Sequence, residues 1–208
     1  MTAAPRAASS KLFFLKEFLR NPRMVGSVIP TSRTAVRALL DPIDWRRVQC
    51  AVEYGPGTGV FTREILRRLG PDGRLIAIDT NASFIELLRA EIADERLICV
   101  EGSAADVEAI VQRHGFSAAD HVVSGLPFST LPNGIADAIM DATARVLKPG
   151  GAFLIYQYSQ FVLSFLSHRF ERVDKGMVLR CIPPARIFWA WKGAARLTAA
   201  DDESLAAA

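Results

Sequence analysis

The chain is poor in the residues that form disulfides or hold metal ions. Its 208 residues include only three cysteines and three histidines: Cys50, Cys99, Cys181, His114, His121 and His168. The cysteines are odd in number and far apart, and they make no zinc-site spacing with the histidines. We therefore expect no disulfide framework, no bound metal and a reducing compartment.

The chain also lacks a large excess of positive or negative charge. The formal net charge is +3, whereas RNA-binding domains usually gather basic residues far more densely. We expect no nucleic-acid partner from this composition, although a modestly basic chain can still meet an anionic surface.

Long apolar runs are nearly absent. Residues 149–167 carry no charge, but this stretch begins Pro-Gly-Gly and contains glutamines, serines and two tyrosines. It predicts a turn, a buried strand and a short apolar segment rather than a membrane span. The N-terminal residues also lack the apolar core of a secretory signal peptide. These absences favour a cytoplasmic protein.

What the chain does contain is an alternation of strand and helix patterns, which is typical of an α/β fold with a parallel sheet. Strands are expected at 48–54, 74–79, 96–101, 120–126, 152–158, 177–182 and 185–192, and helices at 59–69, 83–93, 104–114 and 133–147. The domain plan is a flexible tail at 1–10, N-terminal amphipathic helices at 11–40, one main domain at 41–193 and a second tail at 194–208.

A glycine-rich turn follows the first expected strand. Residues 53–59 read Glu-Tyr-Gly-Pro-Gly-Thr-Gly, and glycines at Gly55, Gly57 and Gly59 allow a sharp turn and close approach of a ligand. A strand, a glycine turn and a helix predict a nucleotide-type pocket at the carboxyl end of a parallel sheet. The alternative is a glycine-rich turn that binds nothing.

The spacing of this turn separates two cofactors. A dinucleotide fingerprint is G-x-G-x-x-G, but here the pattern is one residue shorter and Glu53 precedes it. It resembles motif I of the class I S-adenosylmethionine-dependent methyltransferases. That resemblance implies a Rossmann-like, seven-stranded, mostly parallel sheet with helices on both faces. It also implies S-adenosylmethionine as cofactor and S-adenosylhomocysteine as product, with Glu53 near the cationic methionine end.

Further residues are implied to hold the cofactor. Asp79 lies 20 residues after Gly59, a spacing at which an acid accepts hydrogen bonds from both ribose hydroxyls. Asn81 either assists there or caps the next helix. Many family members have an acid where Ser103 stands, so Ser103 and the Ala104 amide are the adenine-side candidates. The resemblance also implies cofactor contacts from Tyr54, Thr58, Gly102, Gly125 and Leu126.

The fourth expected strand is followed by Ser124-Gly125-Leu126-Pro127-Phe128. In the methyltransferases that act on amino groups of nucleic acid bases, an Asn or Asp stands where Gly125 does. Gly125 has no side chain to orient a planar base, so Pro127, Phe128 and the backbone carbonyls remain on the substrate side. The alternative is that Leu126 and Phe128 only pack.

Residues 11–23 have the pattern of an amphipathic helix. Leucines and phenylalanines share one face, and basic residues surround it: Leu12, Leu15, Leu19, Phe14, Phe18, Lys11, Lys16, Arg20 and Arg23. Such a helix can lie in an anionic membrane interface. The alternative is that it covers the sheet or the active site.

The basic helix, the segment 25–33, the glycine turn and Gly-Leu-Pro-Phe together resemble the bacterial phospholipid N-methyltransferases. These enzymes convert phosphatidylethanolamine to phosphatidylcholine, and the resemblance covers about residues 11–192. It implies a phospholipid substrate and a cytoplasmic enzyme bound peripherally to the inner membrane, with residues 11–23 on an anionic membrane surface.

The acceptor amine must lose a proton, because an alkyl amine titrates near ~10. The candidate proton acceptors are Tyr156, Tyr158 and His168, or the lipid phosphate acting through water. Phe128 and the two tyrosines could also form a cage for the methylated cation. The headgroup phosphate needs donors, for which the candidates are Ser27, Thr31, Ser32, Arg33 and Arg169; for Thr31 and Ser32, helix capping is as good an interpretation.

Three other functions remain open from the sequence. The first is an rRNA adenine N6-dimethyltransferase, which shares the glycine turn and a related Asn-Leu-Pro-aromatic motif. The second is a small-molecule methyltransferase whose N-terminal helix is only a lid. The third is a non-catalytic S-adenosylmethionine-binding membrane sensor.

Overall fold

The computed structural model describes residues 32–132, 134–179 and 184–193. The expected helix at 11–23 and the candidate residues Ser27 and Thr31 lie outside this part of the chain. The expected tails at 1–10 and 194–208 lie outside it as well.

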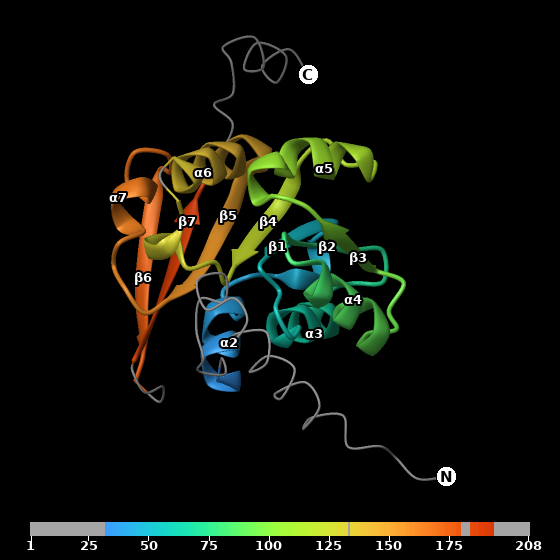
Figure 1. The fold of residues 1–208 in the computed structure, drawn as a ribbon. Helices are drawn as coiled ribbons and strands as arrows, with labels where there is room; N and C mark the ends of the chain where they lie inside the picture. The colour runs from blue at the N-terminus through green and yellow to red at the C-terminus, as the bar shows by residue number, and fades with distance from the viewer. Residues whose placement is uncertain (1–31, 133, 180–183, 194–208) are drawn as a thin grey trace, which may run out of the picture.

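Seven strands form one sheet in the order β3-β2-β1-β4-β5-β7-β6 (Figure 1). Strands β1 to β5 are parallel, and β7 runs antiparallel to both β5 and β6. The expected seven-stranded, mostly parallel α/β fold is therefore confirmed. The strands are β1 Cys50–Tyr54, β2 Arg74–Asp79, β3 Leu97–Glu101, β4 Ala119–Ser124, β5 Leu147–Gln157, β6 Arg172–Val178 and β7 Ala185–Trp191.

Helices cover both faces of this sheet. They are α2 Arg33–Leu40, α3 Val60–Arg68, α4 Ala82–Glu91, α5 Val107–Arg113, α6 Ile135–Val146 and α7 Leu163–Leu166. Short 3-10 turns lie at Trp45–Arg47, Ala104–Asp106 and Phe128–Thr130. One apolar cluster lies between the sheet and α5, α6 and α7, and a second lies between the sheet and α2 and α3.

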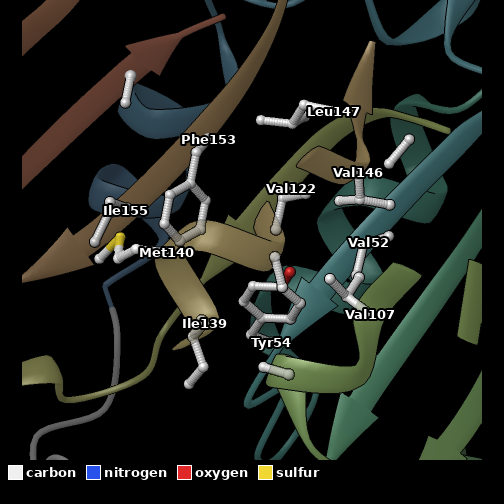
Figure 2. Close-up of a cluster of buried hydrophobic side chains, with 14 of the residues drawn as sticks. Val52, Tyr54, Val107, Val122, Ile139, Met140, Val146, Leu147, Phe153 and Ile155 are labelled. Carbon is white, nitrogen blue, oxygen red and sulfur yellow. The ribbon is translucent and has the colours of Figure 1, made fainter. Parts of the chain in front are cut away.

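The two clusters follow from strand alternation. Val52 and Tyr54 enter the cluster under α5 and α6, while Ala51 between them enters the cluster under α2 and α3, because successive strand residues point to opposite faces. Figure 2 shows Tyr54 and Phe153 in the first cluster, among aliphatic side chains. Parallel strands buried on both faces produce the continuous apolar runs seen in the sequence.

Three predicted elements need correction. The strand expected at 177–182 is wrong, because β6 occupies Arg172–Val178. The helix expected at 104–114 is split into a 3-10 turn and α5. The turn expected at 149–151 lies inside β5, where Gly150 has φ +76° and the pairing with β4 shifts register near its start.

The strand order places a topological switch point beside β1. β1 pairs with β2 on one side and with β4 on the other, so the connections leave the carboxyl ends of β1 and β4 in opposite directions. Ligands of open α/β sheets bind at such a switch point. Within the described residues, none of the helices combines the length and apolar character that crossing a bilayer requires.

Candidate active site

The turn after β1 takes the conformation that its glycines predict. Gly55, Gly57 and Gly59 have φ of 63°, 53° and 77°, in the left-handed region that side chains disfavour. Gly59 is the N-cap of α3, and the Gly55 amide donates to the Ile78 carbonyl of β2. A Cβ at Gly57 would meet no atom within 4 Å. The backbone at Gly57 therefore has open space beside it.

Glu53 is a buried carboxylate with one oxygen to spare. Its side chain is 1% exposed, and its Oε2 accepts a hydrogen bond of 2.7 Å from the Thr62 hydroxyl. Among the described residues, its Oε1 has no hydrogen-bond partner. Burial raises the pKa of Glu53 to about 7. A buried acceptor left unpaired is costly, so this oxygen fits a cationic or hydrogen-donating ligand.

Asp79 ends β2 beside this turn. Its Oδ1 accepts from the Asn81 amide at 2.9 Å. Burial raises the pKa of Asp79 to about 6, against the lowering effect of backbone hydrogen bonds from Asn81, Gly57 and Thr80. The Asn81 side chain accepts from the Ser83 amide and caps α4, so the capping interpretation is confirmed.

The end of β3 lies next to Asp79. The Gly102 amide donates to the Asp79 carbonyl at 2.9 Å. Ser103 caps the following 3-10 turn, because its Oγ accepts from the Ala105 amide at 3.2 Å. The turns after β1, β2 and β3 thus form one polar edge, on which the buried acid Glu53 and the half-buried acid Asp79 lie.

The loop after β4 is held by two side chains. The Ser124 Oγ accepts from the Leu126 amide at 3.1 Å, and the Gln157 Nε2 donates to the Leu126 carbonyl at 2.9 Å. The Gly125 amide donates to the Tyr54 carbonyl, which fastens the loop to β1. Sequence reasoning missed Gln157; the available signal was an amide at the end of an apolar strand.

Tyr156 and Tyr158 form a pair at the end of β5. Their hydroxyls lie 2.9 Å apart, and their rings meet edge to face with centroids 5.6 Å apart. The Tyr156 ring also contacts Phe61, at 5.9 Å between centroids. Phe61 stands next to Thr62, which holds Glu53. The tyrosine pair and Glu53 therefore lie on the same face of the sheet, joined by the first turn of α3.

Two predicted residues point away from this region. Phe128 is 1% exposed and packs edge-on against Phe153, with centroids 6.2 Å apart, in the cluster under α6. The expected cage of Phe128 with both tyrosines is therefore wrong, and the packing interpretation holds for Phe128. Tyr54 is buried on the same side, with its hydroxyl 3.0 Å from that of Thr143, so only its backbone reaches the turn.

The candidate phosphate donors are separated in the structure. Arg169 forms ion pairs with Asp137 and Asp141 of α6, which raise the pKa of its guanidinium and occupy it. His168 is exposed on the turn after α7. Ser32 caps α2, because its Oγ accepts from the Ala35 amide at 3.1 Å. Arg33 follows it, exposed in the first turn of α2.

The fold and the switch point define the class of protein, and comparison with known proteins agrees. A family described as "Methyltransferase domain" matches residues 51–151. The chain belongs to the class I S-adenosylmethionine-dependent methyltransferases, and S-adenosylmethionine is its methyl donor, with S-adenosylhomocysteine as product.

Among its relatives is the ornithine lipid N-methyltransferase of Singulisphaera acidiphila. The two chains are 31% identical over 182 residues, which cover 85% of this chain and 93% of that protein. A ubiquinone/menaquinone biosynthesis C-methyltransferase, UbiE of Pseudomonas paraeruginosa, is 30% identical over 120 residues. The match covers 58% of this chain and 46% of UbiE, so the chain spans about half the length of that relative.

Solved structures share the fold at low identity. The O-methyltransferase TomG from Streptomyces achromogenes, in complex with S-adenosylmethionine, gives a TM-score of 0.68 at 17% identity and covers 93% of this chain and 92% of its own. The N-methyltransferase NodS from Bradyrhizobium japonicum, in complex with S-adenosylhomocysteine, gives 0.65 at 14%, covering 88% and 98%.

Proposed function

We propose that this enzyme methylates the amine of a membrane lipid, with phosphatidylethanolamine and its methylated intermediates as acceptors and phosphatidylcholine as the final product. The observation that carries the proposal is the relative named for an ornithine lipid, whose similarity extends over nearly the whole of both chains. A match confined to residues 51–151 would support only the donor half of the site.

On the donor side, Glu53 is the proposed partner of the ammonium group of the methionine end, through its unpaired Oε1. Asp79 is the proposed acceptor for the ribose hydroxyls, and the turns at 55–59 and 102–104 supply backbone amides. S-adenosylmethionine brings a methyl group that its sulfonium already activates. The protein therefore has mainly to align the acceptor with it and to exclude water.

On the acceptor side, the proposed partners of the amine are the Leu126 carbonyl, fixed by Gln157, and the tyrosine pair. The amine arrives mostly protonated, since alkyl amines titrate near ~10. Tyr156 and Tyr158 are the proposed route for its proton, and their ring faces suit the cation that remains after methylation. The absence of a polar side chain at Gly125 favours a flexible amine over a planar base.

The headgroup phosphate is proposed to meet Arg33. In the described residues Arg33 makes no ion pair, whereas Arg169 already has two carboxylate partners. Residues 11–23 are proposed to bring the enzyme to the cytoplasmic surface of the inner membrane.

A second acceptor is favoured by the same relative. An ornithine lipid also presents an amine near an interface, so it is a direct competitor of phosphatidylethanolamine as the natural substrate. The two lipids differ in that only phosphatidylethanolamine carries a phosphate, so a phosphate-binding role for Arg33 distinguishes them.

The test is incubation of the purified protein with S-adenosylmethionine labelled in its methyl group. The acceptors are vesicles containing phosphatidylethanolamine, vesicles containing ornithine lipid, and ribosomal RNA. We expect label in the lipids, with products that migrate as methylated phosphatidylethanolamine and phosphatidylcholine. Arg33→Ala should weaken turnover of phosphatidylethanolamine about tenfold while donor affinity stays unchanged. Label found only in RNA, or in ornithine lipid alone, would contradict the proposal.

A further inference from the structure

Arg63 places a positive charge near the start of α3, where the helix dipole disfavours it. α3 begins at Val60, and its first turn contains no acidic residue. The positive end of the helix dipole lies at this terminus, so a cation there is unfavourable unless other groups compensate for it. The groups that bind the guanidinium therefore indicate its role.

One side of the guanidinium binds the end of the glycine turn. Its Nη1 donates to the Thr58 carbonyl at 2.6 Å and to the Gly59 carbonyl at 3.1 Å. These are the last two carbonyls of the turn before α3. A Cβ at Gly59 would lie 2.8 Å from the Arg63 Nη1, so the arginine lies directly against the glycine backbone.

The other side of the guanidinium is anchored on α4. Its Nη2 donates to the Glu91 Oε2 at 2.6 Å, and the Glu91 side chain is only 19% exposed. The same helix packs on the turn, because a Cβ at Gly59 would lie 2.7 Å from the Leu88 side chain. α3 and α4 are neighbours in Figure 1. Arg63 thus connects the glycine turn to the helix that follows Asp79.

Holding these two carbonyls also fixes the amides of the same peptide groups, because the peptide unit is planar. The amide opposite the Thr58 carbonyl is that of Gly59, which donates to the Pro56 carbonyl at 2.9 Å. The amide opposite the Gly59 carbonyl is that of Val60, one of the first amides of α3, which have no acceptor inside the helix. Arg63 therefore helps to set the direction of the amides at the end of the turn.

We propose that Arg63 is a positioning residue for binding of the methyl donor. It acts through the glycine turn, and Glu91 acts through Arg63. The guanidinium holds the turn in its binding conformation before S-adenosylmethionine arrives, so less conformational freedom is lost on binding. This inference rests on the donor half of the proposed function, in which the turn at 55–59 supplies backbone amides to the donor.

An ordinary surface ion pair would have a different consequence. The Arg63 side chain is 44% exposed, and exposed ion pairs stabilise proteins only slightly. Such a pair would leave donor affinity unchanged. Arg67, one turn further along α3, is a matched control, because its side chain is 63% exposed and its bonds within the described residues go to Glu64.

The test is calorimetric titration of the full chain with S-adenosylhomocysteine. Arg63→Ala should weaken affinity about tenfold, because charge-assisted bonds to the turn are lost. Arg67→Ala should bind like the wild type. Arg63→Lys should bind within about threefold of the wild type, since an ammonium keeps the charge but lacks the guanidinium fork. Wild-type affinity in Arg63→Ala, or no recovery in Arg63→Lys, would overturn the inference.

The role of Glu91 is tested by a double-mutant cycle. Glu91→Gln keeps the size of the side chain and removes its charge, so it should weaken donor affinity about threefold in the wild-type background. In the Arg63→Ala background it should have no further effect, because the group through which it acts is gone. Equal effects in both backgrounds would contradict the proposed action of Glu91 through Arg63.

Amide hydrogen exchange of the donor-free protein gives a readout that does not depend on donor binding. Exchange in residues 55–63 should be faster in Arg63→Ala than in the wild type, while exchange in β1 and β4 should be unchanged. Arg67→Ala should exchange like the wild type throughout. Faster exchange spread over the whole domain in Arg63→Ala would mean general destabilisation and would overturn the inference.

Failure of this inference and failure of the proposed function can be told apart. The donor titration contains no acceptor, so it gives the same answer whether or not a lipid is methylated. If Gly57→Ala and Arg63→Ala both bind the donor like the wild type, the proposed donor site at the turn is wrong. If only Arg63→Ala does so, the site stands and the positioning role of Arg63 is wrong.

Discussion

At the scale of single residues, Glu53 is a buried carboxyl group whose environment bears directly on donor binding. It is enclosed by the sheet and α3, one oxygen is held by Thr62, and the other has no partner in the described residues. Burial raises its pKa from 4.5 to about 7. Near pH 7 only part of the free enzyme therefore carries a proton on Glu53, and that proton must leave for the carboxylate to pair with a cationic ligand.

The pH dependence of stability should reveal this proton. Because the folded pKa of Glu53 is raised, its contribution to stability is complete below pH 4.5 and is lost as the pH rises through about 7. We expect the free energy of unfolding to fall over this window less steeply in Glu53→Gln than in the wild type. Urea unfolding at a series of pH values measures this. Glu95→Gln, an exposed site, should follow the wild type.

Donor binding should show the opposite trend. From pH 6 to 7 the donor's ammonium stays protonated, since α-amino groups titrate near ~8, while Glu53 becomes ionised. Affinity should therefore rise with pH in the wild type. In Glu53→Gln it should be about tenfold to a hundredfold weaker at pH 7 and should rise less with pH over this range, because Asp79, whose pKa is about 6, still becomes ionised there. Calorimetric titration with S-adenosylhomocysteine is the measurement, and equal affinities in the two proteins would contradict the assignment.

The positions of the site residues were predictable where their spacing from the glycine turn fixes them. They were less predictable where the role of a side chain depends on the face of the sheet to which it points. Glu53 and Asp79 lie at the ends of β1 and β2, as their spacing from the glycine turn indicates. Tyr54 follows Glu53 directly, so strand alternation sends its side chain to the other face. Phe128 turns into the core after a short loop, and no local pattern records which way such a loop turns.

At the scale of elements, the glycine turn carries a prediction with a close control. Gly57 and Gly115 both have positive φ, and a Cβ at either would meet no atom within 4 Å. Alanine at each should cost about 1–2 kcal/mol, the penalty for a left-handed residue. Gly57→Ala should also lower donor affinity at least about tenfold, because its methyl group enters the proposed pocket.

Thermal unfolding and donor titration of both variants test this. Gly115 lies in the turn between α5 and β4, away from the pocket, so Gly115→Ala should keep wild-type affinity. A loss of affinity in both variants, in proportion to their loss of stability, would mean that the Gly57 effect is a general consequence of strain. It would then say nothing about the position of the donor.

The elements themselves were largely predictable because most of the parallel strands are buried on both faces and read as apolar runs. β6 was misplaced for the same physical reason. As an edge strand it is mostly exposed, and its sequence Arg-Val-Asp-Lys-Gly-Met-Val lacks an apolar run. The more apolar residues that follow β6 have the stronger strand pattern, so the strand was predicted too far along the chain. The two tyrosines share a face because they alternate along one strand, as the sequence predicts. The bond from Gln157 to Leu126 depends on which strands adjoin, and local sequence does not encode that.

At the scale of the whole molecule, the domain core and the segment proposed to bind the membrane should separate experimentally. We expect deletion of residues 1–23 to leave the unfolding transition and donor affinity close to those of the full chain, since the described sheet and its helices begin at residue 32. Sedimentation with anionic liposomes should decrease, because the deletion removes the basic and apolar residues of the expected interfacial helix. Unchanged sedimentation would contradict that expectation.

The first turn of α3 has a consequence for both substrates together. Thr62 is bonded to Glu53 on the donor side, and the adjacent Phe61 packs on Tyr156 on the acceptor side. The first turn of α3 thus contacts residues on both sides of the proposed site. Any free energy of coupling between donor binding and acceptor binding that this turn transmits must be reciprocal. The factor by which the proposed aminolipid acceptor changes the donor's affinity then equals the factor by which the donor changes the affinity for that acceptor.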